Sequence, residues 1–314
     1  MAVVWKLSII SLQSKSLIKG VILKKNPFYK RGEFGVFDNL NMLIKSYFTS
    51  PLKNSDIRIV LEDKDYLVVT DAYGMFELKL DISFKTKPKI IIWFQNIKLN
   101  INQNYPVFFK NENSKIAVIS DIDDTILVSH TANTLMRIGV LSLVPSHKRE
   151  TILLTQKLLN LINKNPTNVF YVSKSESNLF KTLYSFISKN NLPKGALLLT
   201  PYLNFKQLLH GKKEKDFKLN TIEFILKNSP DKKFILFGDD TQKDMEIYAT
   251  IVKLFPNKIE RIYIRQTVKR LNKQKTTLLK KLKEAFFATI YFNESTDLKL
   301  ELKEVEDLLM SKTF

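Results

Sequence analysis

The stretch Ile116–Leu127 reads IAVISDIDDTIL and joins a short apolar run to a cluster of acidic residues. Its first five residues are typical of a buried strand in a parallel sheet, because such strands are apolar on both faces. Asp121, Asp123 and Asp124 follow at once, and three carboxylates so close together repel one another unless a cation lies among them. Ligands of open α/β sheets bind beyond the carboxyl ends of the strands. The stretch therefore predicts a site for Mg²⁺-dependent phosphoryl transfer.

The spacing of these residues suits that chemistry. Asp121, the first residue after the strand, can attack phosphorus and form an aspartyl-phosphate. Asp123 lies on the same side of an extended chain, so it can protonate the leaving oxygen and later activate water. Thr125 completes the D-x-D-x-T pattern and is predicted to bind the phosphate. The alternative is an acidic turn in which Asp123 or Asp124 caps a helix.

The composition is that of a globular protein. The 314 residues are enough for one large domain or two ordinary ones, and 44% of them are hydrophobic. No apolar run of about 18 residues is present, and the first residues lack the layout of a signal peptide, so we expect a cytoplasmic protein without a transmembrane segment. The absence of cysteine excludes disulfides and thiol catalysis. A formal net charge of +19 favours anionic partners such as membrane surfaces, nucleic acid or polyphosphorylated substrates.

Two kinds of pattern divide the chain. Residues 1–113 contain short apolar runs separated by turn formers, which predicts a small all-β sandwich domain. Within this part, TDAYGMF predicts a hairpin in which Asp71 opens the turn and Gly74 takes a positive φ angle. Residues 114–314 alternate strand and helix patterns, which is typical of an α/β domain with a parallel sheet. We place the boundary in the polar segment 104–114.

The apolar runs give the expected elements. N-terminal strands are expected at 3–10, 17–23, 57–61, 66–69, 76–80 and 90–94, and C-terminal strands at 116–120, 169–173, 196–199, 233–237, 261–264 and 287–292. Helices are expected at about 151–163, 176–189, 216–228, 242–254 and 268–286, and from Thr296 onward.

Further polar residues at strand and helix ends complete a candidate site. Ser173 ends the strand VFYVS, where its hydroxyl and the following amides can hold a phosphate oxygen. Lys218 lies early in the helix FKLNTIEFIL and can orient the nucleophile and stabilise charge on the phosphate. The rival lysines for this role are Lys212, Lys213 and Lys215.

A second acidic pair follows the strand KFILF. Gly238 is expected to form a tight turn there, and Asp239 and Asp244 make a G-D-x-x-x-x-D pattern before the next helix. Two acidic pairs after two strands of one sheet are hard to explain by folding alone, and carboxylates are preferred ligands of Mg²⁺. The pattern therefore predicts Asp239 and Asp244 as metal ligands, with Asp240 as an alternative to Asp244.

Together, these motifs are similar to those of the haloacid dehalogenase phosphatase superfamily. In particular, residues from about 115 to 310 resemble the catalytic domain of the phosphatidate phosphatase family that acts in yeast actin patches and has bacterial relatives. The resemblance is carried by SDIDDTIL (120–127), FYVSKSESNLF (170–180), LPKGALLL (192–199), FKLNTIEFIL (217–226), FGDDTQKDMEIY (237–248), YIRQ (263–266) and IYFNES (290–295). It implies a haloacid-dehalogenase-like Rossmannoid sheet, and a β-rich N-terminal segment also occurs in such proteins.

The resemblance implies Mg²⁺-dependent dephosphorylation of phosphatidate or a related lipid phosphate. It makes Asp121 the nucleophile and Asp123 the acid and base, with Asp121, the carbonyl of Asp123, and Asp239 around the metal. Relatives tend to carry Ser-Pro-Trp where this chain has Ser175-Glu176-Ser177. Two alternatives stay open: a phosphatase for nucleic-acid ends or phosphoproteins, and a non-catalytic membrane- or protein-binding module on a phosphatase scaffold.

Two segments bear on contact with a membrane. The apolar segment 135–144 either dips into a lipid interface or forms a buried core helix. The basic run from Lys269 to Lys283 either binds anionic lipid or forms a solvated helix face. The short spacings between the motifs leave no room for a large cap over the site, which favours an open site and a substrate embedded in an interface.

Overall fold

The computed structural model describes residues 1–27, 43–102, 108–109, 114–127, 151–164, 167–203, 216–241 and 243–311. The chain divides into two compact units. The first comprises Met1–Lys110, Glu176–Phe180 and Thr200–Glu214, and the second comprises Asn111–Ser175, Lys181–Leu199 and Lys215–Phe314. The domain boundary between residues 113 and 114 stays a prediction.

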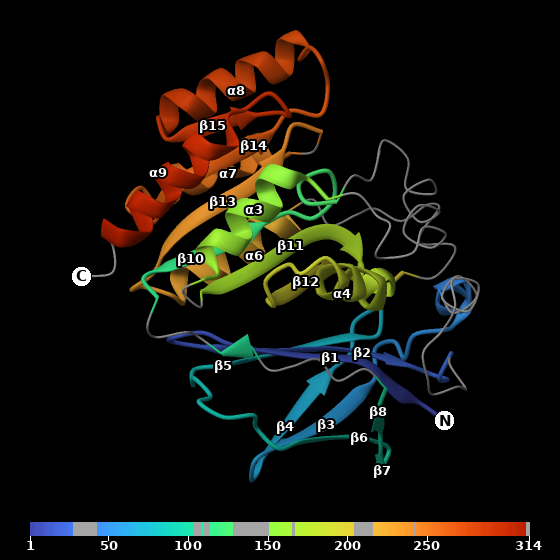
Figure 1. Ribbon diagram of the computed structural model, residues 1–314. Helices are drawn as coiled ribbons and strands as arrows, with labels where there is room; N and C mark the ends of the chain where they lie inside the picture. The colour runs from blue at the N-terminus through green and yellow to red at the C-terminus, as the bar shows by residue number, and fades with distance from the viewer. Residues whose placement is uncertain are drawn as a thin grey trace. The chain divides into compact units, whose positions relative to one another are not determined.

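Two sheets form the first unit (Figure 1). One has the order β5-β2-β1-β8 and contains β1 (Val3–Ser11), β2 (Ser16–Leu23), β5 (Met75–Leu80) and β8 (Asn100–Ile101), with β9 (Phe108–Phe109) also paired to β1. The other has the order β4-β3-β6-β7 and contains β3 (Asp56–Leu61), β4 (Lys64–Val69), β6 (Ile90–Phe94) and β7 (Ile97–Lys98). The pairs β1–β2 and β2–β5 and all pairs of the second sheet are antiparallel, whereas β8 and β9 run parallel to β1.

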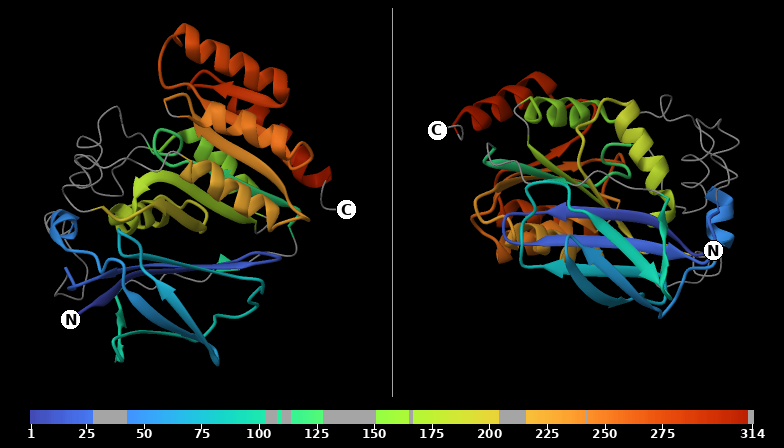
Figure 2. Two further views of the ribbon diagram at one scale, coloured as in Figure 1. Left: turned by 180° about the vertical axis from the view of Figure 1, so that it is seen from behind. Right: turned by 90° about the horizontal axis from the view of Figure 1, so that it is seen from below.

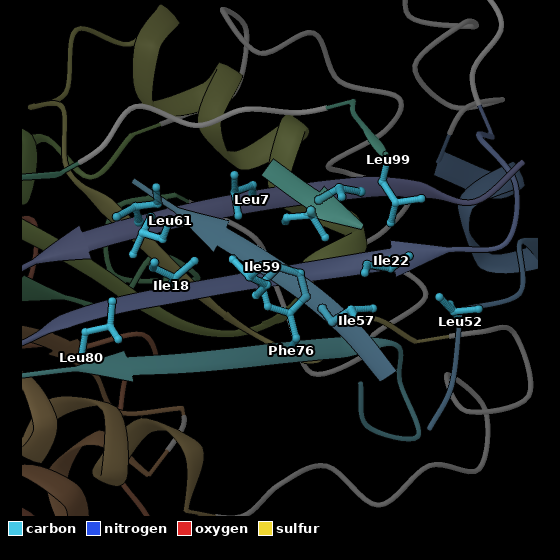
Figure 3. Packing of buried hydrophobic residues seen from close by; sticks show 13 residues of the cluster. Leu7, Ile18, Ile22, Leu52, Ile57, Ile59, Leu61, Phe76, Leu80 and Leu99 are labelled. Atoms are coloured by element: carbon cyan, nitrogen blue, oxygen red, sulfur yellow. The ribbon is translucent and has the colours of Figure 1, made fainter. Parts of the chain in front are cut away.

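One hydrophobic cluster is shared by the two sheets (Figure 3). Ile18 and Ile22 of β2 and Phe76 of β5 contribute from the first sheet, and Ile57 and Ile59 of β3 contribute from the second. Along β3 the apolar residues alternate with Asp56 and Arg58, which are exposed, so only one face of the strand enters the core. A cluster made by facing sheets is the packing that the predicted sandwich requires.

The turn between β4 and β5 has the expected chemistry, but the two strands belong to different sheets, so the predicted hairpin is wrong. Gly74 has a φ angle of 70°, a conformation that glycine adopts without steric cost. The Asp71 carboxylate accepts hydrogen bonds from the amides of Tyr73 (2.7 Å) and Met75 (2.8 Å). Asp71 is therefore a turn residue whose side chain is satisfied by the backbone.

Strand β1 is buried on both faces. One face contributes Val4, Leu7 and Ile9 to the cluster between the two sheets. On the other face, Trp5 belongs to a separate hydrophobic cluster with Val21, Leu23 and Tyr202. The register of β1 against β2 shifts between Val4 and Lys6. The Lys6 side chain is buried here, and its Nζ lies 4.4 Å from the centroid of the Phe180 ring.

The second unit is built on one six-stranded sheet with the order β12-β11-β10-β13-β14-β15 (Figure 1). The strands are β10 (Ile116–Ser120), β11 (Asn168–Glu176), β12 (Ala196–Thr200), β13 (Lys233–Asp239), β14 (Ile259–Arg265) and β15 (Thr289–Phe292). From β10 to β15 every neighbouring pair is parallel, as is the pair β10–β11. The strand order reverses direction between β10 and β13, which makes this the topological switch point of a doubly wound sheet.

Helices cover both faces of this sheet. They are α3 (Leu153–Ile162), α4 (Phe180–Lys189), α6 (Phe217–Lys227), α7 (Asp244–Leu254), α8 (Lys273–Ala285) and α9 (Leu298–Ser311), and a 3₁₀ turn, η2 (Ser177–Leu179), precedes α4. Helix α7 contacts α6 and α8, and α3 contacts α9. Figure 1 shows α3 and α9 in front of the sheet, and the left view of Figure 2 shows α6 and α7 from behind.

The predicted α/β architecture with a parallel sheet is confirmed. Several boundaries differ by a few residues, since α4 begins at Phe180 and α8 at Lys273. Strand β11 continues to Glu176, so Ser173 lies inside the strand and not at its end. Part of the expected polar linker is β9, which pairs with β1. Within the ranges that the structure describes, no helix combines the length and the apolar character needed to cross a membrane. The segment 135–144 lies outside the described residues.

Candidate active site

The candidate site begins where the two central strands of the six-stranded sheet end. Ser120 of β10 pairs with Phe237 of β13, and the Asp121 amide donates a hydrogen bond to the Phe237 carbonyl (2.9 Å). Asp239 is the last residue of β13. Asp121 and Asp239 therefore lie at the switch point, where ligands of doubly wound sheets bind.

Three carboxylates meet there around one lysine. Asp121, Asp239 and Asp244 each offer an oxygen within 4.8 Å of the others, and all three side chains are buried. Lys218 reaches the cluster from α6, with its Nζ 2.5 Å from Asp244 Oδ1 and 3.3 Å from Asp121 Oδ2. The formal charge is −3 + 1 = −2, which one divalent cation balances.

Burial controls the ionisation of this cluster. It raises the pKa of Asp121 well above the usual range, and the charge of Lys218 opposes that rise. It also raises the pKa of Asp239 to about 7, with a further contribution from Asp244. For Lys218 burial alone would lower the pKa, but the charges of Asp121 and Asp244 outweigh it and raise the pKa. A cluster that holds a charged lysine and excess carboxylate is stabilised by a further positive charge, either a proton or a metal ion.

Gly238 makes room for this arrangement. A Cβ atom at position 238 would lie 2.6 Å from Asp244 Oδ2 and 2.9 Å from Tyr248 Cε2, so no larger residue fits without displacement. The Asp239 amide also donates to Asp244 Oδ2 (3.3 Å). Gly238 lies within β13 and has no positive φ angle, so the expectation of a tight turn at this residue is wrong.

The side chain of Asp123 is held by two serines. The hydroxyls of Ser173 (3.1 Å) and Ser175 (2.7 Å) both donate to Asp123 Oδ2. The Ser175 amide donates to Ser173 Oγ (3.0 Å), which fixes that hydroxyl in turn. Ser173 thus contacts the predicted acid and base, and its predicted role in phosphate binding stays a prediction. Sequence analysis missed Ser175, although Ser173 and Ser175 share one face of β11 because strand side chains alternate.

The loop after β10 contains a residue in the left-handed backbone conformation. Asp124 has a φ angle of 56°, a region that aspartate tolerates better than most residues. Its amide donates to the Leu127 carbonyl (2.8 Å), and its carbonyl accepts from Arg265 Nη1 (2.8 Å). Thr125 Oγ1 is buried and has no hydrogen-bond partner in the described part of the chain. The loop thus leaves the buried Thr125 hydroxyl for a partner that the described residues do not supply.

The structure separates the two acidic residues that sequence analysis left as alternatives. The Asp240 carboxylate accepts hydrogen bonds from the Thr267 amide (3.2 Å) and the Tyr291 hydroxyl (2.7 Å). Asp244 instead joins Asp121 and Asp239 in the cluster. We therefore take Asp244 as the second acidic residue of the candidate metal site.

A further lysine lies within electrostatic range of the cluster. Burial lowers the pKa of Lys174, and the charges of Asp244 and Asp121 act against that effect. Sequence analysis missed Lys174, which stands between Ser173 and Ser175. The rival lysines at positions 212, 213 and 215 lie outside the described residues.

The donor set fits a hard divalent cation. Carboxylate oxygens are the ligands that Mg²⁺ and similar ions prefer. Both carboxylate oxygens of Asp121 are buried and accept no hydrogen bond from the described residues, and Oδ2 forms an ion pair with the Lys218 ammonium at 3.3 Å. The buried acidic triad can therefore hold a metal ion.

Fold and site together define a doubly wound α/β domain with a buried carboxylate and lysine cluster at its switch point. Residues 116–266 match the family described as the catalytic domain of phosphatidate phosphatase APP1. Phosphatidate phosphatase APP1 of Saccharomyces cerevisiae is 30% identical over 244 residues, which cover 73% of this chain. Residues 116–266 therefore belong to the phosphatidate phosphatase catalytic-domain family.

The matches extend over less than half of the relatives. The aligned part spans 40% of the S. cerevisiae protein. An uncharacterized protein of Schizosaccharomyces pombe is 24% identical over 239 residues, which cover 72% of this chain and 38% of that protein. A chain in the solved structure of the Pnkp1/Rnl/Hen1 complex is 14% identical, and the match covers 57% of this chain and 53% of that chain. Its TM-score of 0.34 is too low to inform the fold or the function.

Proposed function

We propose that this protein is a Mg²⁺-dependent phosphomonoester hydrolase of the haloacid dehalogenase superfamily and that its substrate is phosphatidate or a related lipid phosphate. The observation that carries the proposal is the buried cluster of Asp121, Asp239 and Asp244 around Lys218. The family match and the yeast relative support the lipid substrate.

Asp121 is the nucleophile in this proposal, and Asp123 is the acid and base. A carboxylate oxygen of Asp121 bonds to phosphorus while the ester bond breaks, and the leaving oxygen takes a proton from Asp123. Asp123 then accepts a proton from water, which attacks the phosphorus of the aspartyl-phosphate and releases inorganic phosphate. The hydroxyls of Ser173 and Ser175 hold Asp123 in place through both steps.

The remaining residues of the proposed site stabilise the negative charge of the phosphate and of the carboxylates. Lys218 favours the ionised form of Asp121 and stabilises negative charge on the phosphate. The buried hydroxyl of Thr125 is available to a phosphate oxygen. Mg²⁺ held by Asp121, Asp239, Asp244 and the carbonyl of Asp123 supplies positive charge that neutralises the phosphate and the carboxylates.

The decisive test compares phosphate release from three substrates, each with Mg²⁺ and with chelator. These are phosphatidate in mixed micelles, a soluble phosphomonoester and an oligonucleotide with a terminal phosphate. We expect metal-dependent release that is greatest with phosphatidate. Asp121→Asn should abolish phosphate release and leave the fold intact. Asp231→Asn should leave phosphate release unchanged, because Asp231 is exposed and precedes the amino end of β13.

Each other outcome selects an alternative. Release only from the oligonucleotide or from the soluble phosphomonoester keeps the chemistry and rejects the lipid. Activity in Asp121→Asn rejects the proposed nucleophile. An inert wild-type protein that binds vesicles favours a non-catalytic membrane-binding module.

We also propose that the protein acts at an anionic membrane surface as a peripheral cytoplasmic protein. Helix α8 has a single buried residue, Leu282, and carries five lysines: Lys273, Lys275, Lys280, Lys281 and Lys283. Phe287 follows the helix with 92% of its surface exposed. A basic helix beside an exposed aromatic residue suits the headgroup region of a bilayer.

A further inference from the structure

A pocket of about 670 Å³ opens beside the candidate active site in the second unit. Its walls come from three segments, Thr151–Leu154 at the start of α3, Arg265–Lys269 after β14, and Phe292–Thr296 after β15, together with Leu298. The volume falls within the ~300–1,000 Å³ of small-molecule sites. None of the residues predicted to carry the chemistry lines it.

The pocket lies along the same edge of the sheet as the carboxylates. Arg265 pairs with Asp239 of β13 on one side and with Phe292 of β15 on the other. Neighbouring strands are ~4.8 Å apart, so the first pocket wall begins about one strand away from the backbone of Asp239. A ligand that filled the pocket could therefore extend to the carboxylate cluster.

The pocket is also tied to the loop that carries Asp121. The Ile152 amide donates a hydrogen bond to the Ile126 carbonyl (2.8 Å), so the α3 wall of the pocket is held against that loop. Arg265 lines the pocket and donates to the Asp124 carbonyl (2.8 Å). Both walls are thereby fixed relative to the predicted nucleophile.

Six of the fifteen residues that line the pocket are apolar, and apolar atoms make up more of its free surface than polar atoms do. Leu154 and Phe292 are buried in its walls, whereas Leu153 is 57% exposed and Val268 is 41% exposed. The polar amide of Gln266 is already engaged, because it donates to the Val268 carbonyl (2.9 Å) and accepts from Asn293 (2.7 Å). The apolar part of this wall gains free energy when an apolar group covers it.

We propose that this pocket receives a fatty-acyl chain of the substrate while its phosphate lies at Asp121. This inference rests on the proposed function and assigns the apolar part of the leaving group to a defined place. The pocket would select for lipid phosphates over small phosphomonoesters with the same reacting group.

The test separates chain binding from catalysis. Leu153→Gln and Val268→Gln place an amide in the pocket at exposed positions, and Leu254→Gln is the matched control, because Leu254 of α7 is 54% exposed and does not line the pocket. Each protein is titrated with a fluorescent fatty-acid analogue. Each is also assayed with glycerol 3-phosphate and with phosphatidates whose two chains are four or six carbons long.

Burial of one methylene is worth ~0.8 kcal/mol, so kcat/KM of the wild type should rise up to about fourfold for each methylene that enters the pocket. Both pocket variants should lose that dependence on chain length and bind the fatty acid at least about tenfold more weakly. Their activity on glycerol 3-phosphate and the behaviour of Leu254→Gln should match the wild type.

The two proposals fail in different ways. Unchanged fatty-acid binding and chain-length dependence in both pocket variants would overturn the pocket while leaving phosphatidate hydrolysis in place. If the wild type hydrolyses no phosphate ester, the proposed function fails, and weaker fatty-acid binding in both pocket variants would still support the pocket. Absence of fatty-acid binding and of any chain-length effect in the wild type would overturn the pocket as well.

Discussion

Substitution of the buried Lys6 should change how the stability of the first unit depends on pH. Burial, with a smaller contribution from the charge of Lys19, lowers the pKa of Lys6 from 10.5 to about 7. Below pH 7 the lysine is charged in both the folded and the unfolded chain, and the cost of burying the charge is fully present. Between about pH 7 and 10.5 only the unfolded chain holds the proton, so the free energy of unfolding rises with pH.

The magnitude follows from the two pKa values. A shift of about 3.5 units at ~1.4 kcal/mol per unit corresponds to a cost on the order of 5 kcal/mol below pH 7. The contact of Lys6 Nζ with the Phe180 ring offsets ~0.5–2 kcal/mol of it. Lys6→Met keeps the length of the side chain and removes its charge. The variant should therefore be more stable than the wild type at pH 6 by a few kcal/mol, and that advantage should shrink by ~3 kcal/mol at pH 9.

Urea unfolding followed by tryptophan fluorescence measures this directly, because Trp5 and Trp93, the two tryptophans of the chain, both belong to the first unit. The difference in unfolding free energy between wild type and variant, at each pH from 6 to 9, removes the contribution of every other titrating group. Lys15→Met is the control, since the Lys15 side chain is 42% exposed and pairs with Asp81. Parallel pH profiles for the wild type and Lys6→Met would refute the reasoning.

Three further substitutions test the active site and the membrane surface. Lys218→Met should lower kcat ~100-fold or more, whereas Lys227→Met on the exposed side of the same helix should leave kcat unchanged; equal effects would reject Lys218 as the functional lysine. Ser175→Ala removes the shorter hydrogen bond to Asp123 and should lower kcat about tenfold with little change in KM, and an unchanged kcat would deny Ser175 a positioning role. Lys280→Ala with Lys281→Ala should weaken sedimentation with anionic vesicles about fivefold per lysine, and equal binding would exclude α8 from the membrane contact.

The elements and the acidic residues were predictable because their signals are local. The run IAVIS is apolar at every position, as a strand with two covered faces requires, and β10 has the predicted bounds Ile116–Ser120. The two acidic pairs follow strands that lie next to each other in the sheet. The parallel architecture alone brings Asp121 and Asp239 to one edge, so no knowledge of side-chain packing was needed to place them together.

Other parts of the structure depend on contacts that sequence spacing does not encode. Glu176 and Asn178 lie in the half of the sequence assigned to the α/β domain, yet both belong to the first compact unit. There Glu176 accepts from the Tyr47 hydroxyl (2.6 Å), and Asn178 donates to Ser46 Oγ (3.2 Å). Because these partners are more than a hundred residues apart, neither periodicity nor turn signals could have indicated them.

The choice between Asp240 and Asp244 shows what the G-D-x-x-x-x-D spacing means physically. Asp239 is the last residue of β13, and Asp240 lies just beyond the strand. Asp240 turns to Thr267 and Tyr291, and the second carboxylate must come from the next element, α7. Asp244 can approach only because position 238 has no Cβ, which would lie 2.6 Å from its Oδ2. The glycine and the distant aspartate are thus one structural feature, and Gly238→Ala would displace Asp244 from the cluster while leaving every carboxylate of the motif in the sequence.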